Sequence, residues 1–217
     1  VEMKEGFRVN TGPLQFSIGR TAFAPVSDVV LNGTEILGED SMSGFEITCD
    51  GRKVSTLEGP VEISFEDKGP LVLTAIVRGW HRDEDGKFLE FSGRVTAFAN
   101  KPYIQIEHQF INTEEPSELA LERLSLKIKP KACGDVQLAL GQGYYRTAIE
   151  TSDDLVEMTL DDETMLYQAN EHFVDCFYGD FWADWRDSCA GVAASIYQAH
   201  QNFPKRLKAT PKGIVVD

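Results

Sequence analysis

Aspartates and aromatic residues alternate over the stretch from residue 172 to residue 187. The members of this group are His172, Asp175, Tyr178, Asp180, Trp182, Asp184, Trp185 and Asp187. Flat aromatic rings stack on the apolar faces of pyranoses, while carboxylates accept hydrogen bonds from sugar hydroxyl groups. The composition of the segment therefore predicts a carbohydrate site in which Tyr178, Trp182 and Trp185 form the stacking platform.

Packing alone explains the same residues, and this interpretation is preferred. Successive side chains on a strand point to opposite faces, so a strand here directs aromatic rings inward and aspartates to solvent. A calcium site is a third and weaker interpretation, because the aspartates lack the DxDxDG spacing of a calcium loop. The residues leave these alternatives open.

The four histidines, at positions 81, 108, 172 and 200, lack the HxH or HxxxH spacing of metal ligands, so no metal site is predicted. His108 alternates with apolar neighbours and is interpreted as a core residue. His200 differs because it lies in a polar cluster with Gln198, Gln201 and Asn202. The nucleophile motif GxSxG is absent. The phosphate-binding motifs GxxxxGK[ST] and GxGxxG are also absent, which excludes the nucleotide-dependent classes of protein, and no cofactor is predicted.

The net charge of −14 repels phosphate backbones, so nucleic acid is not expected as a partner. One candidate basic patch exists, but its first three lysines also fit the solvated face of one strand, and that interpretation is favoured. Its members are Lys127, Lys129, Lys131, Lys205, Arg206 and Lys208. The cysteines at 49, 133, 176 and 189 show no CxxC spacing, and both buried thiols and two disulfides stay open.

The elements that must position these residues are strands. Period-two alternation with Gly, Pro or Asn punctuation recurs about every ten residues, which is typical of a sandwich or barrel. The segment from Leu71 to Trp80 is apolar on both faces and is predicted to be central and covered on two sides, with a polar hairpin tip from His81 to Lys87. We predict an all-β chain, a large antiparallel β-sandwich of the supersandwich type with little helix. Residues 1–217 are expected to form a single domain, with a weak internal boundary near 130–134.

No apolar run approaches the roughly 20 residues of a membrane helix, so no membrane partner is predicted. The first residues, VEMKEGFRVN, show no signal peptide, and the chain does not begin with methionine. We expect a processed product or a piece excised from a longer modular chain, and secreted and cytoplasmic locations both stay open.

Several segments, in this order along the chain, resemble the sandwich domain of exo-acting rhamnogalacturonan lyases and their bacterial relatives. They are NTGPLQF from Asn10, Gly59-Pro60-Val61, Gly69-Pro70-Leu71, PYIQIEHQFIN from Pro102, and the stretch from Phe181 to Lys205 that ends in Phe-Pro-Lys. The resemblance covers most of the chain. It implies a parent protein with a small N-terminal barrel, a central sandwich and a C-terminal α/α toroid that carries much of the active cleft.

The resemblance implies that this chain is the sandwich module of a polysaccharide lyase-like protein, acting on a rhamnogalacturonan or pectin-type glycan. We expect it not to be catalytic by itself, since no segment matches the toroid, and no catalytic residue is assigned. Should the module contribute to β-elimination, a base and cations are needed beside the uronate carboxylate, and His200, Lys205 and Arg206 suit these roles. A structural strand end is the preferred alternative for these three residues.

The alternative function is a non-catalytic carbohydrate-binding or structural scaffold domain. The expected binding residues are then Tyr178, Trp182, Trp185, His200, Lys205 and Arg206. The predicted partners are a polysaccharide or oligosaccharide and the other domains of a parent chain.

Overall fold

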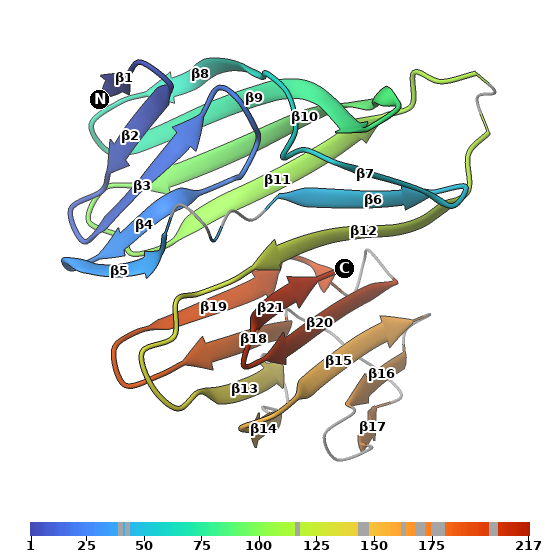
Figure 1. The fold of residues 1–217 in the computed structure, drawn as a ribbon. Coiled ribbons are helices and arrows are strands. Elements are labelled where there is room, and N and C mark those ends of the chain that lie inside the picture. Colours follow the sequence, from blue (N-terminus) through green and yellow to red (C-terminus); the bar gives the residue numbers. More distant parts are fainter. Residues whose placement is uncertain are drawn as a thin grey trace. The chain divides into compact units, whose positions relative to one another are not determined.

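The computed structural model describes residues 1–38, 41, 44–115, 118–142, 148–161, 164–167, 172–174, 181–199 and 204–217. The chain is all-β, and its strand pairs are antiparallel (Figure 1). It divides into two compact units, unit 1 from Val1 to Leu126 and unit 2 from Lys127 to Asp217. The all-β antiparallel sandwich predicted from the alternation is thus confirmed. The expectation of a single domain stays a prediction, because two compact units can fold either together or independently.

Unit 1 contains two sheets. The first runs in the order β1-β2-β3-β4-β5, as a meander of neighbouring strands. Its strands are β1 (Glu2–Met3), β2 (Gly6–Asn10), β3 (Leu14–Gly19), β4 (Ser27–Leu31) and β5 (Thr34–Leu37). The turn between β4 and β5 holds Asn32 and Gly33 at positive φ values of 49° and 86°, as is typical of an Asn-Gly pair in a tight hairpin.

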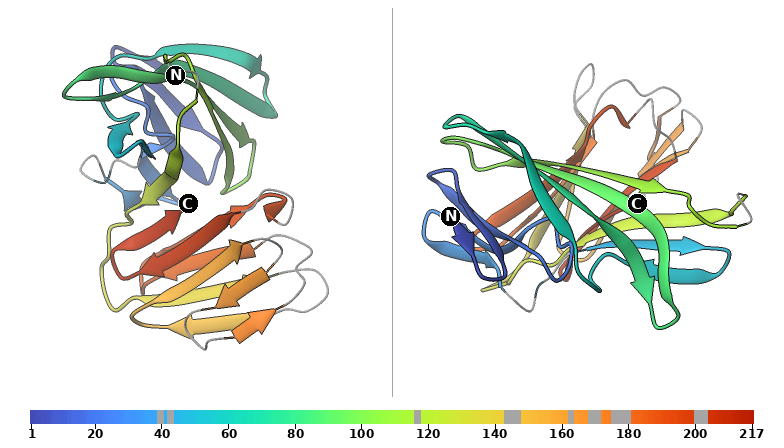
Figure 2. Two further views of the ribbon diagram at one scale, coloured as in Figure 1. Left: turned by 90° about the vertical axis from the view of Figure 1, so that its right-hand side faces the viewer. Right: turned by 90° about the horizontal axis from the view of Figure 1, so that it is seen from above.

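The second sheet of unit 1 has the order β11-β10-β9-β7-β6-β12, and β8 also pairs with β9. Its strands are β6 (Phe45–Cys49), β7 (Arg52–Ser55), β8 (Glu62–Lys68), β9 (Val72–Asp83), β10 (Gly86–Phe98), β11 (Ile104–Ile111) and β12 (Leu121–Ile128). The long strands β9 and β10 bend along their length (Figure 2, right). β12 begins in unit 1, where it pairs with β6.

The inner faces of these two sheets share one core. Phe16 of β3 and Phe91 of β10 are both fully buried, and Phe23 stacks on Phe91 with ring centroids 5.4 Å apart. Gly93 makes this stacking possible, since a Cβ at that position would lie 2.3 Å from the Phe23 ring. Unit 1 is therefore a sandwich whose layers are locked by aromatic packing.

Unit 2 is a second pair of sheets (Figure 2, left), ordered β14-β13-β18-β19 and β21-β20-β15-β16-β17. The strands are β13 (Gln137–Gln142), β14 (Ala148–Ser152), β15 (Val156–Asp161), β16 (Thr164–Tyr167), β17 (His172–Val174), β18 (Phe181–Arg186), β19 (Gly191–Ile196), β20 (Lys205–Thr210) and β21 (Gly213–Val216). Leu140, Met158, Phe181 and Leu207 meet in one buried cluster between the sheets.

Two expectations about the β9–β10 hairpin are wrong. β9 is central in its sheet, but its outer face carries the exposed Arg78 between the half-buried Ile76 and Trp80, so this face is not covered along its whole length. The polar tip is also shorter than predicted. β9 continues to Asp83 and β10 begins at Gly86, so His81 lies within the strand and is fully buried. A bulge at Leu89, whose φ is 55°, adjusts the register there.

No helix among the described residues is long and apolar enough to cross a bilayer.

Candidate functional site

The residues expected to bind sugar do not form one site in the described structure. Tyr178 and His200 lie outside the described residues. Trp185 is 1% exposed, points into the core of unit 2, and donates a hydrogen bond from Nε1 to the carbonyl oxygen of Pro211 at 3.1 Å. Neither face of this ring is open to a sugar, so the packing interpretation describes Trp185.

Trp182 and Asp184 point to the opposite, outer face of β18. Trp182 is half-buried and lies beside small residues, with Gly141 on β13 and Ser195 on β19 as its cross-strand partners. Asp184 is 8% exposed and accepts hydrogen bonds from the guanidinium of Arg186. Because that carboxylate is already paired, Trp182 is the one described member of the predicted platform that is not in the core, and Asp184 beside it is not free.

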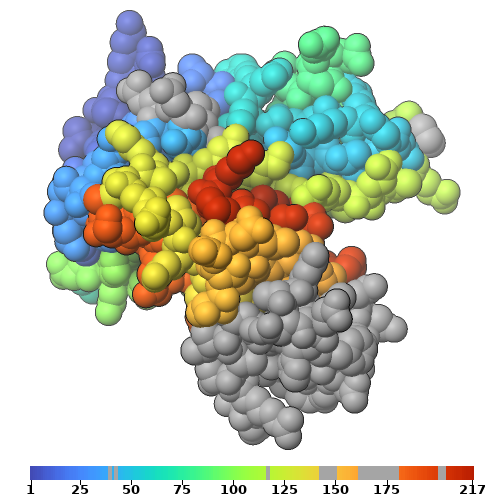
Figure 3. Space-filling model, turned by 60° about the horizontal axis from the view of Figure 1, so that its bottom comes forward, coloured from blue at the N-terminus to red at the C-terminus, as the bar shows by residue number. Residues whose placement is uncertain are grey.

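Lys205 and Arg206 are neighbours on β20, so their side chains point to opposite faces of the strand. Arg206 binds the carboxylates of Asp217 and Glu157, and Lys208 also reaches Glu157 at 3.3 Å. The segments that carry this cluster, residues 156–161 and 204–217, lie side by side in Figure 3. Arg206 is thus neutralised by acids, and the two cations do not form a joint anion site.

A hollow of about 470 Å³ lies on the outer face of unit 1. No site was predicted at this position from the sequence. Two rows of cross-strand partners line it: Arg78–Ser92–Gln109 and Ile76–Arg94–Glu107. The side chains of these residues alternate with buried residues on β9 and β10 and with half-buried residues on β11, which places them on the more exposed face. The alternation of three separate strands contained this signal, but only their pairing brings the polar positions together.

The two arginines of the hollow differ in their surroundings. Arg94 is fixed between Glu66 and Glu107, with one 3.0 Å contact to each carboxylate. The hydrogen bond that Arg94 donates to the Glu107 carboxylate, together with the charges of both acids, raises the pKa of Arg94. Arg78 is exposed, although Glu62 is its partner on β8, and it makes no salt bridge with any described residue. The hollow therefore contains one guanidinium that is held and neutralised by two acids, Arg94, and one cation that is available to a ligand, Arg78.

An aromatic ring continues the same face. Trp80 is half-buried, lies two residues beyond Arg78 on β9, and therefore points to the same side of the sheet. Its indole is contacted by the ammonium group of Lys87 at 5.4 Å from the ring centroid. A ring and a free guanidinium roughly 7 Å apart along one strand can engage adjacent parts of an oligosaccharide.

Behind this face, two histidines pair on the inner side of the sheet. His81 Nδ1 lies 2.8 Å from the carbonyl oxygen of Leu89, which can only accept, so Nδ1 carries the proton. His81 Nε2 then accepts from His108 Nε2, 3.1 Å away. Burial lowers the pKa of His81, and burial together with the neighbouring His81 lowers the pKa of His108 to about 3. Both rings are neutral core residues, as predicted for His108.

A second pocket of about 330 Å³ opens beside Cys49 and is lined by Leu89, Phe110 and Leu119 among others. Cys49 is a free thiol and is 1% exposed. Burial, followed by the charges of Asp50 and Glu122, raises its pKa. A neutral thiol is a poor nucleophile, so this pocket lacks an activated group.

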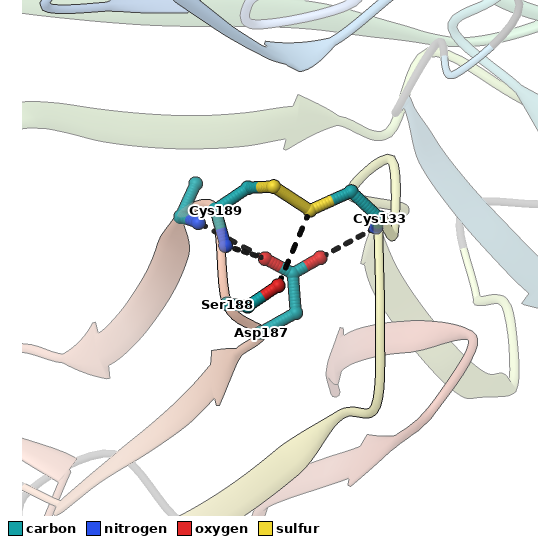
Figure 4. The surroundings of a disulfide bond; sticks show 5 residues. Cys133, Asp187, Ser188 and Cys189 are labelled. Atoms are coloured by element: carbon teal, nitrogen blue, oxygen red, sulfur yellow. Dashed lines mark hydrogen bonds between the residues drawn. A yellow bond between two sulfur atoms is a disulfide. The ribbon is translucent and has the colours of Figure 1, made fainter.

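Cys133 and Cys189 form a disulfide, which the sequence had left open (Figure 4). The Asp187 carboxylate accepts backbone hydrogen bonds from Cys133, Cys189 and Ala190 at 2.7 to 3.0 Å, and these donors lower its pKa. The potential metal ligands of this cluster lie within 4.8 Å of one another. Because the sulfurs are bonded to each other, the cluster has no thiolate and is structural in this state. Cys176 lies outside the described residues.

No protein-family model matches this chain, and no curated protein matches its sequence.

Proposed function

We propose that this chain is a glycan-binding β-sandwich module of a polysaccharide lyase-like protein, not catalytic by itself, and that it binds its glycan on the outer face of β9, β10 and β11. The observation that carries the proposal is the hollow of about 470 Å³ beside Arg78, a cation without a carboxylate partner among the described residues. This volume lies in the ordinary range of ligand sites.

The side chains of the hollow suit sugar hydroxyl groups. Ser92 and Gln109 both donate and accept hydrogen bonds, and Glu107 accepts them. Arg94 is held in place by two acids, so a ligand does not have to immobilise a free side chain there. Trp80 extends the face with an apolar surface for a pyranose ring.

One cation of the site, Arg78, favours an acidic sugar. The chain carries a net charge of −14, so a polyanion is repelled by most of the surface. Arg78 locally opposes this field, and its planar guanidinium matches a carboxylate with two parallel hydrogen bonds. A uronate of a pectin-type glycan, the glycan class implied by the sequence resemblance, supplies such a carboxylate.

The described residues do not favour catalysis. β-Elimination needs a base that reaches the proton beside the uronate carboxylate. His81 and His108 are bonded to each other on the inner face of the sheet, and Arg206 is paired with acids. These groups give the described part of the chain no exposed pairing of a base with a free cation.

The test combines binding and turnover on the isolated chain. Rhamnogalacturonan oligosaccharides are titrated while tryptophan fluorescence is followed, and the absorbance of the unsaturated elimination product is recorded in parallel. We expect saturable binding, no product, and about tenfold weaker binding for Arg78→Gln, which corresponds to roughly 1.4 kcal/mol. Lys212→Gln removes the same charge from an exposed turn in unit 2 and is expected to bind normally. Turnover by the isolated chain would contradict the non-catalytic assignment, and equal binding by both variants would contradict the site.

A further inference from the structure

The strand β19 forms one edge of a sheet in unit 2. It pairs along its full length with β18, from Gly191 opposite Arg186 to Ile196 opposite Phe181. In the part of the chain that the structure describes, no strand pairs with its other side (Figure 1). One row of its backbone N–H and C=O groups is therefore free to pair with a further strand.

The sequence of β19 lacks the features that normally protect such an edge. Charged residues make up 26% of the chain, yet none occurs from Ala190 to Gln198, and β19 contains no proline and no bulge. The edge strand β8 differs, since four of its seven residues are charged: Glu62, Glu66, Asp67 and Lys68. Inserted charges and prolines are the usual means of preventing edge pairing. Their absence indicates that β19 tolerates a partner.

The edge is also held in a fixed shape. The turn before β19 is tied by the Cys133–Cys189 disulfide, and Asp187 caps the backbone N–H groups of Cys189 and Ala190 (Figure 4). Further along, the hydroxyl of Ser195 donates to the carbonyl of Phe181. A strand that is already ordered loses little conformational entropy when another strand joins it.

We propose that β19 pairs antiparallel with β19 of a second copy of this chain, around a two-fold axis at Ala194. In this register Val192 lies opposite Ile196 of the other copy, and Ala193 lies opposite Ser195. Tyr197, which is 77% exposed, lies in the turn that follows β19 and takes no part in this pairing. β-Branched pairs are favourable in antiparallel sheets, and no like charges meet.

The strand pair alone makes a small interface, so the dimer is weak and reversible. Each copy carries a net charge of −14, and this repulsion opposes association. Salt screens such charges, so the dimer strengthens as ionic strength rises. A dimer held by ion pairs instead weakens as ionic strength rises.

Analytical ultracentrifugation over a range of protein concentrations tests the proposal with two charge variants of exposed positions. We expect the wild-type mass to rise from 24.2 kDa toward twice that value, more readily at higher salt. Ala193→Lys with Ser195→Lys places lysines opposite each other in this register and is expected to remain monomeric. Ala193→Lys with Ser195→Glu places opposite charges together and is expected to restore the dimer.

Circular dichroism is the control for folding. Both variants are expected to keep their β structure, because Ala193 and Ser195 point to solvent. The proposal is overturned by a wild type that stays monomeric at millimolar concentration and high salt. It is equally overturned if the two variants associate to the same extent, since that result places the contact elsewhere or in another register.

Discussion

His81 on β9 and His108 on β11 are joined by a hydrogen bond between their Nε2 atoms at 3.1 Å, inside unit 1. The His108 ring also stacks on Phe45 with centroids 3.9 Å apart. The remaining bond of His81, to the carbonyl of Leu89, holds the one leucine whose φ is positive among the described residues. The pair thus connects β9 and β11, which lie on either side of β10, to the bulge near the β9–β10 turn.

We predict that unit 1 loses stability when the pH falls below about 6.5. The pKa of His108 is lowered from 6.5 to about 3, so the unfolded chain binds a proton that the folded chain rejects. This contribution is fully present above pH 6.5 and is lost as the pH falls toward 3. At pH 5 the loss from this residue is roughly 2 kcal/mol. Denaturant titrations at pH 7 and pH 5 measure it.

His108→Phe is the matched variant for that measurement. Phenylalanine keeps the stacking on Phe45 but leaves His81 Nε2 without its donor, so stability at pH 7 is expected to fall by about 1–3 kcal/mol. The difference between pH 7 and pH 5 should become smaller than in the wild type. An unchanged difference would show that other groups cause the acid sensitivity.

We predict that the Cys133–Cys189 disulfide stabilises unit 2. It closes a loop with a sequence separation of 56, for which loop-closure entropy gives about 4 kcal/mol. Cys133→Ser with Cys189→Ser should lower the melting temperature, and reducing agent should then have no further effect. Cys49→Ser serves as the control for loss of a thiol, because Cys49 is not in a disulfide and its variant should still respond to reducing agent.

Two tryptophans are predicted to respond in opposite ways to truncation. Trp185 fills the core of unit 2, so Trp185→Ala should cost about 3–5 kcal/mol of stability while a glycan still binds unit 1. Trp80 is half-buried on the outer face of β9, so Trp80→Ala should weaken glycan binding more than it lowers the melting temperature. The reverse pattern would move the binding surface to unit 2.

The strands and turns were predictable because alternation and turn residues are local signals. Leu14–Ile18 and the Asn32-Gly33 turn are examples, and both follow from period-two patterning and positive φ. The proposed binding face was not predictable, because it depends on the pairing of three strands. Arg78 meets Ser92 and Gln109 only in the folded sheet.

The described members of the predicted site lie apart from one another for a related reason. Composition placed Trp182 and Trp185 together, but the register and the core put them on opposite faces of β18. The pairing of Arg206 with Asp217 was also invisible in the sequence, because it joins two strands of one hairpin across eleven residues. His81 looked like part of a polar tip, since the length of a hairpin is set by pairing and bulges.

We propose above that Arg78 binds the carboxylate of an acidic glycan on the outer face of β9, β10 and β11. Isothermal titration calorimetry with one rhamnogalacturonan oligosaccharide, used both native and with its carboxyl groups reduced to alcohols, tests this claim most directly. We expect the wild type to bind the native glycan with about tenfold higher affinity than the reduced glycan, and Arg78→Gln to bind both forms equally and weakly. Equal affinity of the wild type for the two glycans, or an undiminished preference in Arg78→Gln, would contradict it.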